Sequence, residues 1–199
     1  MTQYPGVMSS PARVSLHLDL FRHWDAKRSG RIMPARRDIN PAEMPNVLPH
    51  VTIIDRAEGR FRYRLVGTAV SRDLGSDLTG GWVGDYVSPP EYAAAILAIY
   101  ERVFDTAGPI FTTGEYRTAS GTIQSISRLI LPLSDDGTKA NMVIFTRVAR
   151  FNRNLKAGMD WLKGAPGKVC QVIDVGTVEE IEQQCFNWER YCLVSSAVA

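Results

Sequence analysis

The stretch FRYRLVGTAVSRDLGSDLTGG, residues 61–81, decides which fold this sequence adopts. It places glycines directly after a strand-like segment, as phosphate-binding loops do. The first six residues, FRYRLV, alternate apolar and basic side chains. A dinucleotide-binding fold needs a strand that is buried on both faces before its glycines, and such strands are continuously apolar. The alternation therefore indicates an antiparallel strand with one wet face.

The glycines after this strand fit no phosphate-binding motif. They stand at positions 67, 75, 80, 81 and 84, which match neither G-x-G-x-x-G nor a Walker loop with its lysine. We therefore expect Gly67 to let the chain leave the strand rather than to hold a phosphate.

Further strands are expected on both sides of this stretch. Residues 51–55 form one, and Glu58-Gly59 turns the chain into the strand at 61–66, which makes an antiparallel hairpin. Three more are expected at 110–118, 122–131 and 140–148. With helices between the two groups, this order predicts an α+β domain over 48–149. Its centre is a five-stranded antiparallel sheet with helices on one face.

Helices are marked by apolar spacing and by capping residues. Leu16, Leu20 and Trp24 recur every four residues within 15–29, which predicts an amphipathic helix. Asn40–Glu43 carries the signals of one short helical turn, inside a proline-rich connector that completes the unit 15–47. Ser88–Glu91 is a capping box that starts a helix with an apolar stripe, and Gly108-Pro109 stops it.

The two ends of the chain are expected to lie outside this domain. Residues 1–14 are expected to be disordered, and 150–199 form a C-terminal extension. Within the extension, 169–175 has the pattern of a strand, and Thr177–Glu180 is a further capping box. The residues after it place Ile181 and Trp188 on a two-heptad apolar seam. Such a helix docks on its own domain or on a second copy.

Several segments resemble one known family. They are the N-terminal helix with Trp24, MPARRDINPAEMPNVLPHV (33–51), FRYRLVGTAV (61–70), DLTGGWVGDYV (77–87) and RLILPLSDDG (128–137). The sequences of these segments are similar to those of the single-PAS bacterial proteins common in alphaproteobacteria, and the order of elements resembles that of a PAS domain. The resemblance covers about 15–150. It implies a small sensory or protein-interaction domain, and the family offers no settled catalytic residues to carry over.

The residues restrict which cofactor such a domain would use. PAS flavin photosensors form their adduct with a core cysteine, but the cysteines here are Cys170, Cys185 and Cys192. Haem sensors of this class ligate iron through a histidine on the helical side of the pocket, and the three histidines all lie at or before His50. We therefore expect neither a flavin adduct nor haem, and no metal site at the cysteines.

Arg128 is the best candidate for binding a ligand. It interrupts the apolar strand SISRLIL (125–131), and a buried guanidinium requires a carboxylate or an anion. An internal salt bridge or an outward-facing arginine would also explain it. If it binds an unidentified small acidic or amphipathic ligand, the candidate neighbours are Tyr63, Trp82, Tyr116 and Arg117. Each of these is also compatible with an ordinary core.

The sequence offers no convincing catalytic residues. Asp135-Asp136 precedes a glycine and is typical of a turn rather than a catalytic dyad. No GxSxG motif is present. We therefore expect no enzymatic activity, although a small enzyme on this fold remains an alternative, as does a ligand-free adaptor for protein interactions.

Self-association is the expected use of the flanking helices. Leu16, Leu20 and Trp24 either pack on their own sheet or form a dimer seam, and Ile181 and Trp188 present the same choice. We expect a homodimer and a separate signalling partner, because the residues outside the domain are too few for an output domain.

The composition favours an ordinary cytoplasmic globular protein. Of the 199 residues, 45% are hydrophobic and 22% are charged, which suffices for a core. The 23 basic and 21 acidic residues nearly balance, so the charge does not favour nucleic acid as a partner. No apolar run is long enough to cross a membrane, and the N-terminus lacks the pattern of a secretory signal.

Overall fold

The computed structural model describes residues 10–87, 89–117, 123–150 and 167–197. The first described element is helix α1, Ser10–Arg28, which begins five residues before the predicted start, so residues 10–14 are helical rather than disordered. Three short 3-10 turns follow at Arg36–Asp38, Pro41–Glu43 and Leu48–His50. The remaining elements are β1 Val51–Ala57, β2 Arg60–Val66, α2 Thr68–Leu74, α3 Val83–Tyr86, α4 Pro90–Thr106, β3 Ile110–Arg117, β4 Ile123–Leu133, β5 Met142–Arg150, β6 Gly167–Asp174 and α5 Val178–Ala197.

The sheet is antiparallel throughout and has six strands rather than the five predicted. Their order is β2-β1-β5-β4-β3-β6. The additional strand is β6, which was predicted as part of the C-terminal extension rather than of the sheet. It pairs with β3 from Ile110 opposite Asp174 to Tyr116 opposite Gly167. It joins the sheet because the edge of β3 would otherwise present unpaired backbone groups.

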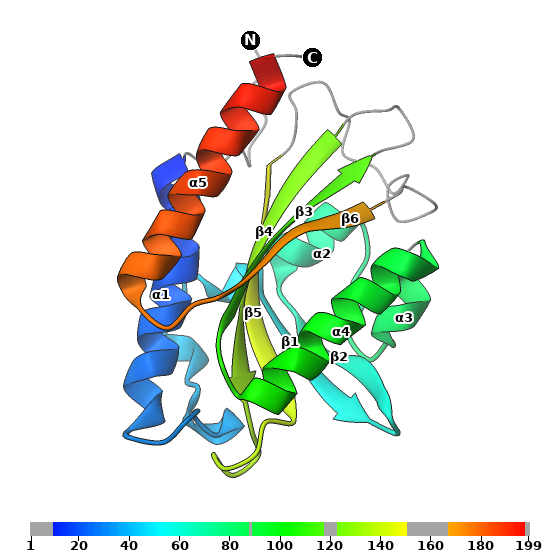
Figure 1. The fold of residues 1–199 in the computed structure, drawn as a ribbon. Coiled ribbons are helices and arrows are strands. Elements are labelled where there is room, and N and C mark those ends of the chain that lie inside the picture. Colours follow the sequence, from blue (N-terminus) through cyan, green and yellow to red (C-terminus); the bar gives the residue numbers. More distant parts are fainter. Residues whose placement is uncertain (1–9, 88, 118–122, 151–166, 198–199) are drawn as a thin grey trace.

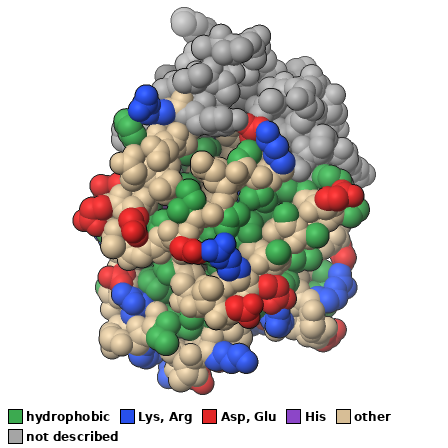
Figure 2. Space-filling model, in the orientation of Figure 1, with side chains coloured by type: hydrophobic (Ala, Val, Ile, Leu, Met, Phe, Trp, Pro, Cys, Tyr) green, Lys and Arg blue, Asp and Glu red, His purple; other side chains and the backbone are tan. Residues whose placement is uncertain are grey.

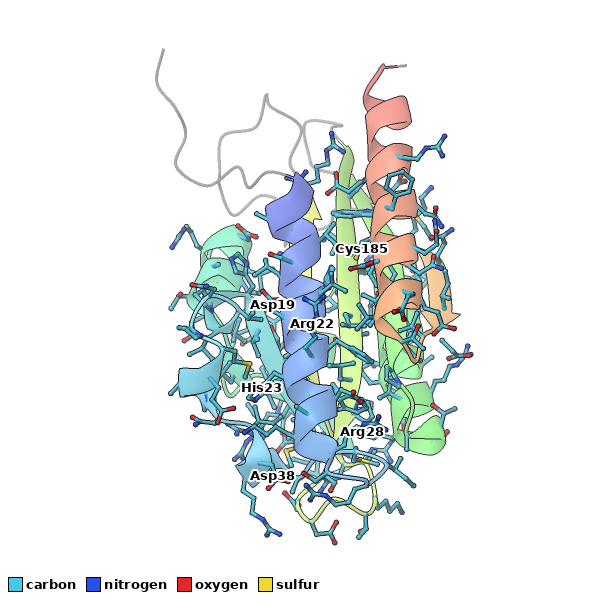
Figure 3. All side chains as sticks on the ribbon, turned by 90° about the vertical axis from the view of Figure 1, so that its left-hand side faces the viewer. Asp19, Arg22, His23, Arg28, Asp38 and Cys185 are labelled. Carbon is cyan, nitrogen blue, oxygen red and sulfur yellow. The ribbon has the colours of Figure 1, made fainter. Side chains whose placement is uncertain are left out.

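Helices cover both faces of the sheet: the helices of the domain lie on one face, as predicted, and the two flanking helices pack on the other. Helices α1 and α5 lie side by side on one face, and α2, α3 and α4 lie on the other (Figure 1 and Figure 3). We call these the outer face and the inner face. The physical reason lies in the central strands, whose apolar residues point both ways. In β4, Leu129 and Leu131 belong to the outer core, while Ile130 belongs to the inner core.

The segment FRYRLV forms the predicted antiparallel hairpin strand. Strand β2 ends at Val66, and Gly67 leads into α2. A Cβ at Gly67 would lie 2.3 Å from the carbonyl oxygen of Pro49, and its N–H donates to the Val51 carbonyl at 2.8 Å. Glycine is therefore required here because two backbones approach closely.

The predicted helix caps are confirmed where the chain is described. The backbone N–H of Glu180 donates to Thr177 Oγ1 at 3.2 Å, and that of Thr177 donates to Glu180 Oε2 at 3.1 Å. Asn40 Oδ1 accepts from the Ala42 N–H at 3.1 Å. Ser88, and residues 1–9 of the N-terminus that was predicted to be disordered, lie outside the described residues.

None of the helices in the described part of the chain has the length and apolarity needed to cross a bilayer. The histidine, cysteine and carboxylate side chains of that part form no group of three that would hold a metal ion. On the face in Figure 2, basic and acidic side chains are interspersed.

Candidate functional site

Three polar residues stand side by side on the inner face of the sheet. Thr112 on β3 pairs with Arg128 on β4, which in turn pairs with Arg147 on β5. Residues paired directly across antiparallel strands project to the same face. Their exposed fractions are only 1%, 6% and 5%. We call these three residues the polar row.

Each arginine of the row has a polar contact with an inner helix. Arg128 Nη2 donates to the hydroxyl of Tyr92 on α4 at 3.1 Å. Arg147 Nη1 lies 3.4 Å from Asp73 Oδ2 on α2. Arg128 is therefore neither outward-facing nor surrounded only by apolar side chains, and the row is held between the sheet and two different helices.

The charges in and around the polar row lower the stability of the fold. Arg128 and Arg147 are like charges placed directly opposite each other, an arrangement that destabilises a sheet. Burial raises the pKa of Asp73, although Arg147, His50 and Arg72 act in the opposite direction. Burial likewise lowers the pKa of His50, and Asp73 only partly opposes this. Desolvation thus dominates around the row, which disfavours charge on both groups.

Thr112 carries an unused hydroxyl. Its Oγ1 is buried and has no hydrogen-bond partner among the described residues. Buried hydroxyls normally find a partner, because leaving one unsatisfied costs about 1–3 kcal/mol. A ligand atom that reached the row would therefore meet a hydroxyl beside two guanidinium groups.

The same two strands carry a different polar contact on the outer face. His17 of α1 lies with Nδ1 2.6 Å from Thr146 Oγ1 and Nε2 2.9 Å from Ser127 Oγ. Burial, reinforced by the nearby His50, lowers the pKa of His17 to about 3. The ring is therefore neutral, so that one nitrogen donates and the other accepts. Ser127 and Thr146 directly precede Arg128 and Arg147 in the chain.

A buried ion cluster joins α1 and α5 at one end of the outer face. Glu189 of α5 accepts from Arg13 Nε at 2.8 Å and from Arg13 Nη2 at 3.2 Å. The Nη1 of Arg150 at the end of β5 also donates to Glu189 Oε2 at 3.4 Å. One carboxylate thus connects two helices and a strand.

The structure distributes the predicted ligand residues over several places. Arg128 lies in the polar row. Tyr63 lies in the inner core with its ring 6.5 Å from that of Tyr86. Trp82 instead packs against Arg60, whose guanidinium lies 4.7 Å from the ring centroid. No described contact brings Tyr63 or Trp82 to Arg128. Tyr116 and Arg117 end β3, and their side chains lie outside the description.

The residues predicted to form a dimer seam are buried in their own chain. They are Leu16, Leu20, Trp24, Ile181 and Trp188, each at most 4% exposed, and all belong to the outer core. Trp24 Nε1 also donates to the Pro132 carbonyl at 2.7 Å. In this structure the seam is therefore replaced by packing on the chain's own sheet. The predicted homodimer itself stays a prediction.

Sequence reasoning missed most of the row. Arg147 interrupts the apolar strand MVIFTRVA (142–149) as Arg128 interrupts its own, so the same signal was present. Thr112 and Tyr92 could not be found in this way, because their proximity depends on strand register and helix docking. His17 stands between Leu16 and Leu18, and its neighbours gave no sign that it would bind two strands.

A groove on the outer face carries exposed ion pairs. The groove, of about 390 Å³, lies between α1 and the segment 43–47, with Asp19, Arg22 and His23 on the helix side (Figure 3). Arg22 lies 3.6 Å from Asp19, and Lys27 lies 2.7 Å from Glu43. The groove is open to solvent, and this exposed pairing offers less to a ligand than the buried row.

The acidic pair at 135–136 has the geometry of a turn, as predicted. Asp136 Oδ1 accepts from the Thr138 N–H at 2.9 Å and from its hydroxyl at 2.7 Å. Both aspartates are exposed. These contacts lower the pKa of Asp136, so the carboxylate is stabilised in its charged form rather than tuned as a general acid.

One family matches this chain over most of its length. The model of the family PAS_5, a PAS domain, matches residues 12–144. The match includes α1, α2–α4 and β1–β4, ends inside β5, and leaves β6 and α5 outside. The search of curated proteins found no match.

Solved structures of light-oxygen-voltage domains are weakly similar to this chain. One, from a study of a flavin analogue, is 10% identical with a TM-score of 0.44, covering 55% of this chain and 83% of that one. An RsLOV variant is 14% identical with a TM-score of 0.38, covering 52% and 61%. An RNA-binding light-oxygen-voltage receptor is 14% identical with a TM-score of 0.37, covering 58% and 35%. At these levels of similarity, the family match is the stronger guide to function.

Proposed function

Because this chain belongs to the PAS domain family, we propose that it is a sensory module with a small acidic or amphipathic ligand on its inner face. Occupancy of that face changes how α1 and α5 pack on the outer face. A separate signalling partner or a second copy of the chain then reads the change. PAS domains are sensing and signalling domains, and the ligand, the partner and the readout are the proposal.

The observation that carries the proposal is the arrangement of polar groups on either side of β4 and β5. Arg128 and Arg147 point to the inner face, and the residues directly before them, Ser127 and Thr146, bind His17 of α1 on the outer face. A shift of either strand that improves contact with a ligand therefore also moves a partner of His17. The inner-face arginines and the outer-face partners of His17 are therefore consecutive residues on the same two strands.

The linkage works as a population shift. A ligand changes an equilibrium between two packings only by the difference in its affinity for them. On the outer face, packing depends on short hydrogen bonds at His17 and on the ion cluster at Glu189, and both are sensitive to small displacements. A modest preference of the ligand for one strand geometry is therefore sufficient to change how firmly α1 and α5 are held.

A flavin adduct at Cys185 is not part of the proposal. Cys185 lies on α5, buried in the outer core, and α5 lies on the opposite face of the sheet from the inner helices. Burial, with Glu189 and Glu182 nearby, raises the pKa of its thiol to about 12.

Catalysis is not part of the proposal, although a serine and a histidine do meet. Ser127 Oγ lies 2.9 Å from His17 Nε2, a distance typical of an activated nucleophile. Both residues are almost completely buried beneath α1, and a pKa of about 3 makes the imidazole a weak base. The pair is therefore suited to holding a helix, not to attacking a substrate.

Native mass spectrometry of gently purified protein tests the proposal. We expect an additional mass of small-molecule size on the protein, which disappears after unfolding and refolding. A protein that stays bare when purified and when incubated with a metabolite extract would contradict ligand sensing and favour the ligand-free adaptor. The same spectrum reports the number of subunits.

A further inference from the structure

We propose that His23 forms a pH-sensitive contact between α1 and the segment 43–47. When the imidazole takes up a proton, the ring leaves its buried position and enters the adjoining groove. The segment 43–47 is then held less firmly against α1. This change needs no ligand, so it does not depend on the function proposed for the inner face.

The imidazole of His23 is buried, but neither of its nitrogens makes a hydrogen bond to a described residue. Its side chain is only 8% exposed and lines the groove between α1 and the segment 43–47 (Figure 3). Nε2 is buried without a partner among the described residues. Nδ1 lies 3.6 Å from Glu43 Oε2, which is beyond the range of about 2.7–3.2 Å for an N–H···O hydrogen bond. The neutral ring is therefore held by packing rather than by hydrogen bonds.

A protonated ring has too few acceptors in this position. The imidazolium carries an N–H on both nitrogens, and each of them requires an acceptor when it is buried. Glu43 Oε2, which faces Nδ1, already lies 2.7 Å from Lys27 Nζ, and Oε1 accepts from Asn40 Nδ2 at 3.0 Å. Nε2 faces no acceptor among the described residues. Burying a charge whose donors are unsatisfied is strongly unfavourable, so protonation favours a different position of the ring.

The surroundings of the buried ring agree with this geometry. Burial lowers the pKa of His23, and Lys27 acts in the same direction, although Glu43 opposes both. Hydrogen bonds, that from Lys27 above all, lower the pKa of Glu43, which stays charged near neutral pH. The other charged residues that line the groove are Asp19 and Arg22, and the remaining lining residues are uncharged. The buried ring is therefore neutral at neutral pH, and a lower pH favours a position closer to solvent and to a carboxylate.

The groove offers such a position directly beside the ring. It has a volume of about 390 Å³ and is open to solvent. Asp19 lies one turn before His23 on α1, and helix side chains lean towards the N-terminus, so the ring can reach this carboxylate. Asp19 is held only loosely, because its partner Arg22 lies 3.6 Å away. A charged histidine four residues after an aspartate makes a favourable pair on a helix surface.

The segment 43–47 is sensitive to the position of this ring because side chains attach it to the outer face. The backbone N–H groups of Glu43, Met44 and Val47 all donate to carbonyls three residues earlier in the chain. Met44 and Val47 are 5% and 1% exposed, belong to the outer core, and line the groove together with His23. A ring that moves into the groove therefore changes the packing beside the two apolar side chains that anchor the segment.

NMR of the full chain between about pH 7.5 and about pH 5 tests this contact. The ring resonances of His23 report its protonation, and hydrogen exchange of the Met44 and Val47 amides, corrected for the intrinsic effect of pH, reports opening of the segment. We expect the ring to titrate below pH 6.5 or so, and protection of both amides to fall about tenfold per pH unit, because only the ring in the groove then binds a proton. A ring still neutral at about pH 5, or amide protection that does not follow its protonation, would overturn the proposal.

Variants separate His23 from the other groups that titrate. In His23→Gln, protection of the two amides should no longer depend on pH, and a dependence that persists would overturn the proposal. Asp19→Asn removes the carboxylate that receives the charged ring, so the loss of protection should begin at a lower pH. Asp25→Asn is the matched control, because Asp25 is an exposed aspartate of α1 that pairs with Arg28. If His23→Gln does not fold, the two aspartate variants still decide, and identical pH dependence in both would place the charged ring outside the groove and overturn the proposal.

Discussion

Two groups of buried polar residues, one on each face of the sheet, are arranged in different ways. On the outer face, both nitrogens of His17 have hydroxyl partners, and Glu189 lies between Arg13 and Arg150. On the inner face, two arginines oppose each other, Asp73 is desolvated, and the hydroxyl of Thr112 has no hydrogen-bond partner among the described residues. Both faces are built on the same strands, β4 and β5, so the sheet itself does not cause the difference.

This contrast separates structural from functional use of buried polar groups. Satisfied groups fix the position of a helix, and replacing one of their members leaves a partner buried and unpaired. Like charges and unsatisfied hydroxyls lower stability, and natural proteins carry such costs at functional sites. We therefore expect outer-face variants to lose stability, with the largest loss at the ion cluster, and inner-face variants to lose binding instead.

Glu189→Gln should cause the largest loss. The change leaves Arg13 and Arg150 without their shared carboxylate in a mostly buried position, and removing one partner of a buried ion cluster costs about 3–5 kcal/mol. Urea unfolding followed by tryptophan fluorescence measures the free energy. Glu182→Gln, an exposed position on the same helix, is the control. Equal losses in the two variants would mean that the cluster does not hold α5.

Ile181→Ala should lower the free energy of unfolding by about 2–5 kcal/mol. Ile181 lies on the fully buried side of α5, and truncating its side chain leaves a cavity. Phe186→Ala, on the exposed side of α5, should change the free energy of unfolding by less than about 0.5 kcal/mol. Both are measured by urea unfolding at several protein concentrations. If the effect of Ile181→Ala depended on concentration, the helix would dock on a second copy instead.

Acid should weaken the outer face through His17. Its pKa is about 3 when folded and about 6.5 when unfolded, so between these values the unfolded chain binds a proton that the folded chain does not. Stability contributed by neutral His17 is therefore present above pH 6.5 and is lost as the pH falls, by about 1.4 kcal/mol per pH unit down to pH 3.

The comparison of wild type with His17→Gln isolates this contribution. Unfolding free energies measured from pH 7 to pH 4 should fall less steeply in the variant, by about 1.4 kcal/mol per pH unit. His23 and His50, whose pKa values are also lowered by burial, stay in both proteins and cancel. Parallel curves would show that His17 is not the neutral residue that the hydrogen bonds require.

Arg128→Met should have the smallest effect on stability, and with the opposite sign from the outer-face variants. Arg128 stands directly opposite Arg147, and removing one of two opposed like charges relieves a destabilising repulsion across the strand pair. We expect the melting temperature to stay the same or to rise slightly. A loss of more than about 3 kcal/mol, the cost of breaking a buried ion pair, would place Arg128 among the structural residues and end the contrast between the faces.

Most of the fold could be predicted because its signals are local. The stripe of Tyr92, Ile96, Ile99 and Val103 identified α4, and all four are buried. Alternation and turn residues identified five strands of the sheet. Strand β6 was recognised as a segment but not as part of the sheet, because its pairing with β3 joins residues about 60 positions apart.

The site was less predictable for the same reason. Arg128 was identified because it breaks an apolar strand, but its neighbours depend on register between strands and on the docking of α4. The buried state of Leu16 and Ile181 was an open alternative, since an apolar seam fits a chain's own sheet as well as a second copy. Which of the two occurs depends on the second apolar face of β3, β4 and β5, and in the structure α1 and α5 cover that face.

Hydrogen–deuterium exchange in wild type and in Arg128→Met tests the link between the two faces most directly. The substitution should change exchange in β4 and β5 and also in α1 and α5, although both helices lie on the opposite face of the sheet from the polar row. Arg64→Met, at an exposed arginine of β2, is the control and should leave α1 and α5 unchanged. Changes in Arg128→Met that are confined to the inner face would contradict a link between the two faces.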